Sequence, residues 1–154
     1  MPESSDWGTP DSCMEAVKIF GLALQFVNNQ TTEICEEAVK QDSWALQYVR
    51  KQTPKICMIA VEKKGWVLKF IEEQTEELCW AAIKNENGSL NDVENQTHEM
   101  CLYVVKQDGW LLKHVKNKTF EICLEAINQN KESIKFVDKK QFPEIHEIWR
   151  LMYE

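Results

Sequence analysis

Cysteine is the residue type in this chain whose spacing first suggests chemistry. The six cysteines follow one another at intervals of 22 residues in a chain of 154: Cys13, Cys35, Cys57, Cys79, Cys101 and Cys123. Thiolates can act as nucleophiles or hold a metal. A zinc site needs four converging ligands, commonly in short pairs such as C-x-x-C, and no two cysteines here are closer than one interval of 22 residues. We therefore expect no metal site and no cofactor.

The same spacing argues against disulfides. Helices that carry successive cysteines would pack about 10 Å apart, which is farther than the Cα atoms of a disulfide allow. Cysteine in a helical core behaves as a small hydrophobic residue. We interpret all six as core positions, and free thiols favour a reducing compartment.

The other residue types that could carry catalysis show no common pattern. His98, His114 and His146 fall at unrelated positions of the 22-residue interval. The sequence has no Gly-rich phosphate loop, no nucleophile elbow and no H-E-x-x-H motif. We predict that the protein is not an enzyme; a small enzyme that uses surface carboxylates is the alternative of a different class.

The elements that position these residues begin at a repeated threonine. One threonine stands four residues before each cysteine: Thr9, Thr31, Thr53, Thr75, Thr97 and Thr119. An acidic residue follows two positions later in every copy except the third, which has Lys55. A threonine hydroxyl can accept the free amide protons of a first helical turn, and a carboxylate there complements the helix dipole. Each threonine therefore predicts a helix N-terminus.

Each predicted helix has one apolar face and an expected end. In the second copy Ile34, Cys35, Ala38 and Val39 have the i, i+1, i+4, i+5 spacing of one helical face. A glycine about eight residues past the cysteine, as at Gly21, predicts that the helix ends there with a left-handed residue. The first helix of each copy should therefore have about three turns.

A second apolar cluster follows in each copy, as in Trp44, Leu46 and Tyr48. We predict a shorter second helix that packs on the first, although alternation over so few residues also fits a strand. Units of this kind bury their apolar faces only by stacking on their neighbours.

The predicted fold class is therefore all-α, an α-solenoid of six 22-residue two-helix repeats with a C-terminal capping helix. We expect a polar N-terminal lead at 1–8, the repeats at 9–141 and the capping helix at 142–154. The last segment has Ile145, Ile148, Trp149 and Met152 at helical spacing, and His146 falls near the slot of the next cysteine.

The wording of the repeat resembles a known family. Ala38-Val39-Lys40-Gln41-Asp42, followed by Trp44 to Val49, is similar to a short helical repeat catalogued as a domain of unknown function. That repeat occurs in tandem in giant-virus proteins and in some bacterial and protist proteins. The resemblance covers about residues 9–141 and implies a helical array and a viral origin, but no activity. Gly88, Asp92 and Glu132 depart from the pattern.

Charge and hydropathy narrow the partners and the location. The net charge is −7, and acidic and basic side chains are interspersed, so we expect no nucleic-acid partner. No stretch approaches the roughly 20 apolar residues of a membrane span, and the polar, acidic start does not resemble a signal peptide. We predict a cytoplasmic protein, in the host cytoplasm or the virion if it is viral, with no membrane partner.

The copies differ most just after the cysteine, on the flank of the first helix. Copy two has Glu36 and Glu37 there, which we expect to face solvent. Later copies carry apolar residues in these slots, and we predict that they contact a partner: Met58, Ile59, Trp80, Leu102, Tyr103 and Leu124. Exposed apolar stripes generally mark interfaces. The alternative, that the flank only widens the core, stays open.

These residues lead to a functional hypothesis. We predict a non-enzymatic protein that mediates protein–protein interaction, with either a protein partner or a second copy of itself in a homodimer. A structural component of a virion or scaffold is the alternative closest to it.

Overall fold

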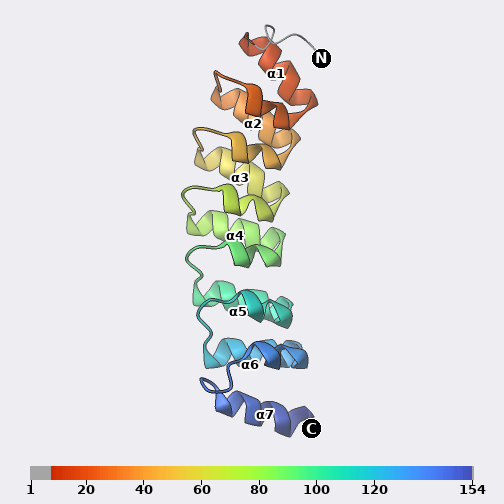
Figure 1. The fold of residues 1–154 in the computed structure, drawn as a ribbon, viewed down its shortest axis with the longest axis vertical. Helices are drawn as coiled ribbons and strands as arrows, with labels where there is room; N and C mark the ends of the chain where they lie inside the picture. Colours follow the sequence, from red (N-terminus) through yellow and green to blue (C-terminus); the bar gives the residue numbers. More distant parts are fainter. Residues whose placement is uncertain (1–7, 154) are drawn as a thin grey trace. The chain divides into compact units, whose positions relative to one another are not determined.

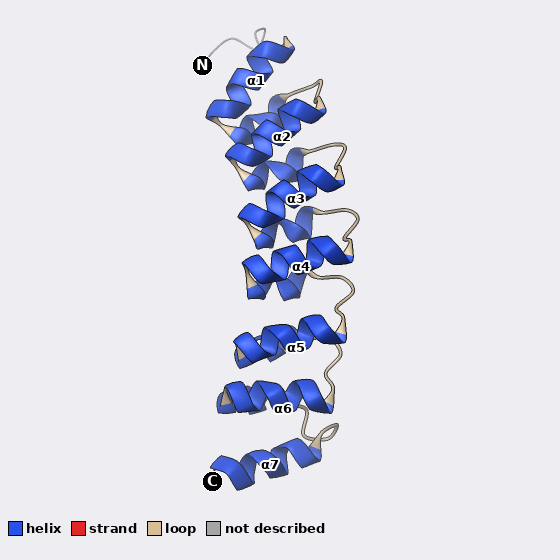
Figure 2. Ribbon diagram, turned by 180° about the vertical axis from the view of Figure 1, so that it is seen from behind, coloured by secondary structure: helices blue, strands red, loops and turns tan. Residues whose placement is uncertain are grey.

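The computed structural model describes residues 8–153, and within that range the chain is helical with no strand (Figure 2). The predicted polar lead therefore lies, apart from Gly8, outside the described residues. The α-helices are α1 (Pro10–Ile19), α2 (Thr32–Gln41), α3 (Pro54–Lys63), α4 (Glu76–Asn85), α5 (His98–Gln107), α6 (Phe120–Gln129) and α7 (Pro143–Tyr153). Between them lie 3₁₀-helices: η1 (Gly21–Phe26), η2 (Ser43–Tyr48), η3 (Gly65–Phe70), η4 (Asn87–Asp92), η5 (Gly109–His114) and η6 (Lys131–Phe136). The predicted all-α repeat fold is confirmed.

The second element of each repeat is helical, as predicted, but it is a 3₁₀-helix of six residues. The strand alternative is wrong. A 3₁₀-helix has three residues per turn, so in η2 the buried Ala45 and Leu46 point inward while Trp44 and Gln47 point outward. A short element of this kind presents one apolar side to the α-helix and leaves the other side to solvent.

The chain divides into two compact units, Met1–Asn85 and Glu86–Glu154. In the first unit α1 to α4 pack side by side, and η1 to η3 form a second row against them (Figure 1). In the second unit α5 packs on α6 and α6 on α7, while η4 and η6 each pack on η5. Each unit is thus built as a two-row, solenoid-like stack of 22-residue repeats. The domain boundaries expected at residues 8/9 and 141/142 stay predictions.

The threonine prediction is confirmed in all six repeats. Each threonine hydroxyl accepts a hydrogen bond from the backbone N–H three residues later, at 3.2 to 3.3 Å. The capping threonines whose dihedrals are described are extended, as N-cap residues usually are. Each cap satisfies one orphan amide of the first turn, so the sequence sets the start of every repeat.

The prediction for the helix C-termini is wrong. No glycine among residues 8–153 has a positive φ; α1 ends at Phe20, which is extended with φ −144° and ψ 97°, and Gly21 begins η1. The need for glycine comes from a neighbour in the next repeat. A Cβ built on Gly21 would lie 2.4 Å from the Ala38 carbonyl oxygen, and one on Gly109 would lie 2.3 Å from that of Ala126. Glycine here permits close approach of two backbones.

The core runs along the contact between the two rows in each unit. The four predicted residues of the second copy, Ile34, Cys35, Ala38 and Val39, are 0 to 4% exposed. The corresponding residues of α3 to α6 are buried in the same way. The helix face read from the sequence is therefore the buried face.

The C-terminal helix α7 packs on α6 and η6 through a smaller contact than the prediction implies. Ile145 is fully buried, and Ile148 and Trp149 are half-buried, with the Trp149 indole donating to the Lys131 carbonyl at 2.7 Å. Met152, expected on the buried face, is 53% exposed. No helix within residues 8–153 is long and apolar enough to cross a membrane.

Candidate interaction surfaces

The six cysteines lie in the interior of the repeats, as the sequence predicts. All six are buried, and none of them is in a disulfide within the described residues. Burial raises the pKa of the Cys35, Cys57 and Cys101 thiols, and it raises the pKa of Cys123 to about 11. A thiol with a raised pKa forms little thiolate near neutral pH and is a poor nucleophile. Within the described residues no group of three His, Cys, Asp or Glu side chains could hold a metal ion.

The cysteines instead contact a glutamine that sequence reasoning missed. The thiols of Cys35, Cys57, Cys79 and Cys101 each lie 3.7 Å from the amide oxygen of the glutamine five residues earlier. These four residues precede the capping threonine: Gln30, Gln52, Gln74 and Gln96. Their 22-residue spacing was a visible signal in the sequence.

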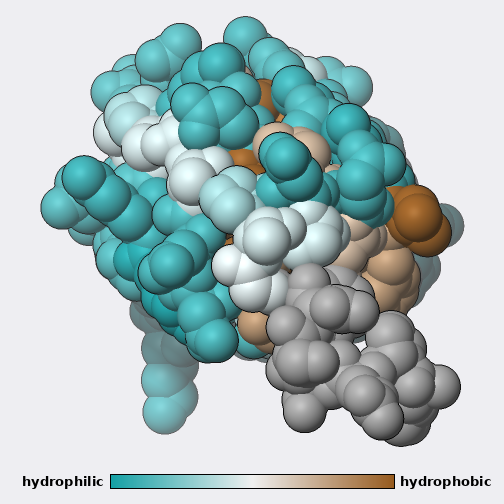
Figure 3. Space-filling view, turned by 90° about the horizontal axis from the view of Figure 1, so that it is seen from above, coloured by the Kyte–Doolittle hydropathy of each residue, from teal (hydrophilic) through white to brown (hydrophobic). Residues whose placement is uncertain are grey.

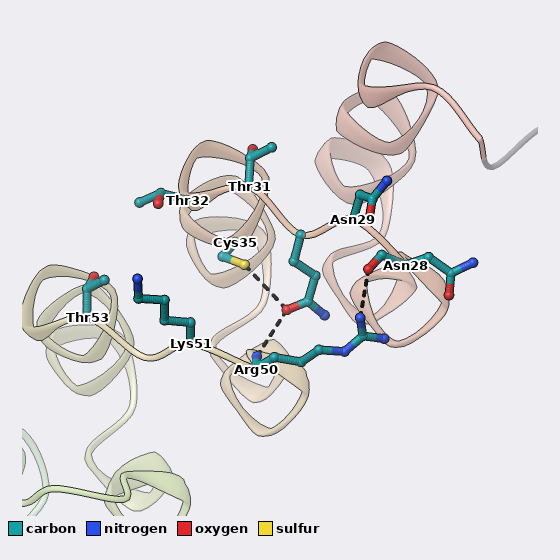
Figure 4. Close-up of a pocket in the computed structure, with 9 residues that line it drawn as sticks. Asn28, Asn29, Thr31, Thr32, Cys35, Arg50, Lys51 and Thr53 are labelled. Atoms are coloured by element: carbon teal, nitrogen blue, oxygen red, sulfur yellow. Dashed lines mark hydrogen bonds between the residues drawn. The ribbon is translucent and has the colours of Figure 1, made fainter.

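The glutamine joins one repeat to the next. The Gln30 amide nitrogen donates to the carbonyls of Leu24 in its own repeat, at 3.4 Å, and Tyr48 in the following one, at 2.8 Å. Its oxygen accepts from the Arg50 backbone N–H at 3.0 Å as well as from Cys35 (Figure 4). Gln52 and Gln96 bond the following repeat in the same way. One side chain thus satisfies backbone groups of two consecutive 3₁₀-helices.

A shallow hollow of about 420 Å³ opens beside this contact in the first unit (Figure 4). Most of its polar lining is already bonded: Arg50 donates to the Asn28 carbonyl at 2.7 Å, and Thr31 caps α2. Two smaller hollows lie along the corresponding loops of the second unit, near Lys116 and near His146. Their position shows that the stacking of repeats generates such hollows at the loop edge.

The three histidines have separate local roles. Burial lowers the pKa of His114, and its Nδ1 lies 3.0 Å from the Asn91 side-chain oxygen in the preceding repeat. His98 pairs with the exposed Glu121 at 3.0 Å, and the Nε2 of His146 lies 3.0 Å from the Val137 carbonyl. The structure does not bring the three together.

The predicted flank of the α-helices is half-buried in every repeat. Intermediate exposure is shared by all six predicted contact residues: Met58, Ile59, Trp80, Leu102, Tyr103 and Leu124. They belong to separate units, with Met58, Ile59 and Trp80 in the first. The flank is therefore neither fully exposed nor fully core, and its contact with a partner stays a prediction.

The flank of copy two carries glutamates instead of apolar residues, and Glu36 shows where the side chains at this position lie. The expectation that Glu36 faces solvent is wrong: its side chain is 13% exposed and bonds Lys55 in the first turn of α3 at 2.7 Å. Glu36 therefore lies in the furrow between α2 and α3. By the 22-residue register, Met58 lies in the furrow between α3 and α4, and Leu102 in that between α5 and α6. An ion pair between neighbouring helices is replaced there by an apolar contact that still reaches solvent.

The tryptophans of the 3₁₀-helices lie nearer the surface than the sequence predicts. Trp44, Trp66 and Trp110 are 38%, 56% and 36% exposed, although we read this cluster as packing residues. The sequence did contain a signal of this exposure. Gly88 and Glu132 replace the tryptophan in two other copies, and a core position tolerates neither residue easily. The outer side of the 3₁₀-helices is thus a second candidate surface.

The α1 end differs from these side surfaces. Figure 3 views the molecule from that end, where hydrophilic side chains cover most of the described surface and hydrophobic ones show between them. Ile19 and Phe20 are 79% and 52% exposed.

The alternation of α- and 3₁₀-helices, with glutamines joining successive copies, defines a tandem helical-repeat protein. A family model described as "Domain of unknown function (DUF4116)" matches residues 11–54, 33–78 and 98–142. The chain belongs to this family, and each match spans about two of its repeats. No curated protein and no solved structure matches the chain.

Proposed function

We propose that this helical-repeat protein is a non-enzymatic binding protein whose partner is another protein or a second copy of itself. The contact surface is the apolar flank of the α-helices, formed by Met58, Ile59 and Trp80 in the first unit and by Leu102, Tyr103 and Leu124 in the second. One observation carries the proposal. The position of the ion-paired Glu36 holds a half-exposed apolar side chain in every later copy, and the position of Glu37 does so in copies three to five; copy six keeps a carboxylate there, Glu125.

Stacking alone does not require this change. The Glu36–Lys55 pair shows that a furrow between two α-helices is closed well by polar side chains. Large apolar side chains in contact with water are unfavourable, and a partner that covers them lowers the free energy. The flank of α3 to α6 therefore suits an apolar partner surface, whereas the flank of α2 does not.

The absence of catalysis is part of the proposal. It is supported by the engagement of Gln30 and Arg50, at the hollow of the first unit, in contacts between repeats, and by the raised pKa of the buried thiols. We also propose, from the family resemblance alone, a cytoplasmic or virion location in a viral system. Fractionation of producing cells and of purified particles tests that location.

Self-association is tested first, by light scattering over a range of protein concentrations. We expect the wild-type mass to rise above the 18.1 kDa of one chain, and Trp80→Glu and Tyr103→Glu to return it to that value. Gln107→Glu is the matched control, since it adds the same charge at an exposed position of α5. Circular dichroism shows whether each variant keeps its helices.

Binding to another protein is tested with the same set of variants. We expect affinity capture from producing cells to retain a partner with wild type and Gln107→Glu and to lose it with Trp80→Glu or Tyr103→Glu. A strict monomer whose captured proteins are the same for all four chains would contradict the proposal.

A further inference from the structure

The same group of side chains occurs twice on the outer side of the 3₁₀-helices. Trp44 packs edge-to-face on Phe70 of the next repeat, with ring centroids 5.4 Å apart and an interplanar angle of 66°. Trp110 packs on Phe136 at 5.6 Å and 69°. A lysine next to the phenylalanine completes each group, so we call them the Trp44 cluster, with Lys69, and the Trp110 cluster, with Lys135.

Each tryptophan is held in place by a carboxylate before it. Asp42 accepts from the Trp44 backbone N–H at 2.9 Å, and Asp108 accepts from that of Trp110 at 3.0 Å. The two clusters lie in different units and repeat the same backbone cap, ring geometry and lysine position. Recurrence of these three matching contacts makes a chance arrangement of surface side chains a poor explanation.

The lysines lie over the rings without a carboxylate partner. The Lys69 ammonium is 4.9 Å from the Trp44 ring centroid, and the Lys135 ammonium is 3.6 Å from that of Trp110. Neither forms an ion pair with any residue in the range 8–153. The ring quadrupole orients a cation but does not neutralise it. Each cluster therefore offers a positive charge beside a partly exposed indole.

The 3₁₀-helices that carry the clusters are less acidic than the whole protein. The chain has a net charge of −7, yet η1, η2 and η3 contain no carboxylate, and Lys69 is their one charged side chain. In the second unit η4 to η6 hold three lysines, one aspartate and one glutamate. The carboxylates that precede the two tryptophans, Asp42 and Asp108, are engaged in capping the tryptophan N–H groups, so the lysine is the group that an anion can pair with.

We propose that the Trp44 and Trp110 clusters bind acidic, apolar segments of a partner protein. A partner carboxylate pairs with Lys69 or Lys135, and the aliphatic or aromatic side chain beside it covers the exposed part of the indole. The inference shares the proposed class of function, protein binding, but uses a different surface from the α-helix flank.

Nucleic acid fits these clusters less well. Stacking of a base needs a free aromatic face, and a backbone needs a row of cations. Here the lysine lies over the tryptophan ring, the phenylalanine packs edge-to-face on it, and each cluster holds a single lysine. A single charge beside an apolar side chain suits a carboxylate next to a hydrophobic residue.

The test uses a fluorescently labelled peptide of alternating Asp and Leu, and fluorescence anisotropy reports its binding to the full chain. A peptide of alternating Asn and Leu and a labelled oligouridylate of similar length are the comparison probes. We expect the acidic peptide to bind most tightly and its affinity to fall as salt is added.

The variants locate the binding. The double variant Lys69→Gln, Lys135→Gln should weaken the acidic peptide by about threefold, since one exposed charge pair is lost at each cluster. Lys113→Gln is the matched control, because Lys113 is an exposed lysine of η5 in the position equivalent to Lys69. Circular dichroism verifies that the double variant stays folded.

Each remaining outcome overturns the inference in a recognisable way. Equal affinity for the acidic and amide peptides, or unchanged affinity in the double variant, removes the charge pairing. Tighter binding of the oligouridylate assigns the clusters to nucleic acid. Loss of peptide binding in Trp80→Glu or Tyr103→Glu, with the lysine variants unaffected, places the peptide on the flank and leaves the proposed function standing.

Discussion

The contact between consecutive repeats and the outward surfaces of the same repeats follow opposite rules. At the contact, Thr31 and Cys35 have the same counterparts in all six copies and Gln30 has them in four; the threonines cap every α-helix, and the four glutamines each contact a cysteine. On the outer surfaces the residue type changes from copy to copy, from Glu36 to Met58 or from Trp44 to Gly88. We infer that folding restricts the residue types at the contact between repeats, whereas the residue types at the outer positions can change to suit a binding partner. Variants of the two regions should therefore affect different measurements.

The largest effect is expected at the closest backbone approach. Gly109→Ala would place a Cβ 2.3 Å from the Ala126 carbonyl oxygen, so α6 must move. We expect the free energy of unfolding to fall by about 3 kcal/mol, measured by urea denaturation. Ser43→Ala is the control, because copy two already accommodates a side chain at the equivalent position. A Gly109→Ala protein as stable as wild type would contradict the close-approach explanation.

The glutamine contact should rank next. Gln52→Ala removes bonds to the Phe70 carbonyl, the Glu72 N–H and the Cys57 thiol. Half-buried backbone groups then lose their partners, and we expect a loss of about 2 kcal/mol in urea denaturation. Gln47→Ala, whose side chain bonds only within its own turn, should cost less than about 0.5 kcal/mol. Equal losses would show that the contact between repeats is not special.

A buried thiol makes the core of the second unit sensitive to alkali. The pKa of Cys123 is raised from 9.0 to about 11, so the folded state binds its proton more tightly than the unfolded state. Stability from this group is complete below pH 9 and is lost as the pH rises toward 11, by on the order of 2 kcal/mol. Denaturation of wild type and Cys123→Ala across that pH range measures it. A slope unchanged in the variant would refute the assignment.

One change at the buried contact should stabilise the protein. Ser133 is fully buried, and its hydroxyl has no hydrogen-bond partner among residues 8–153. Ser133→Ala removes that unpaired group, and we expect a gain of about 1 kcal/mol, seen as a higher melting temperature in calorimetry. Ser89→Ala should act in the same direction, since its hydroxyl is also unpaired. A lower melting temperature in both would mean that the hydroxyls are bonded.

The smallest change in stability is expected on the outer surface. Lys135→Gln removes the contact with Trp110 at an exposed site, so unfolding should change by about 0.5 kcal/mol or less. Peptide affinity should nevertheless fall in this variant, while Gly109→Ala should leave the affinity of the remaining folded protein unchanged. A lysine variant that loses stability and keeps affinity would reverse the comparison between the two regions.

Local patterns made much of the fold predictable. The capping threonines and the face formed by residues such as Ile34 and Ala38 depend on neighbours within one helix, so the sequence displays them directly. The role of the glycines was predicted wrongly because glycine suits both a left-handed turn and a close approach of two backbones. The close approach is to the carbonyl oxygen of Ala38, which is 17 residues away from Gly21 in the sequence. The residues of the α-helix flank could be identified from the sequence, but their half-burial depends on the adjacent helix.

By itself the sequence determined the 22-residue period, the start of each α-helix, its buried face and the core position of the cysteines. These follow from hydrogen bonds and side-chain spacing inside a single repeat. Tertiary structure alone decided that Trp44 and Trp110 remain partly exposed and that Gln30 joins two repeats. Their surroundings come from side chains about one repeat away, and stacking, rather than local propensity, brings those side chains into contact.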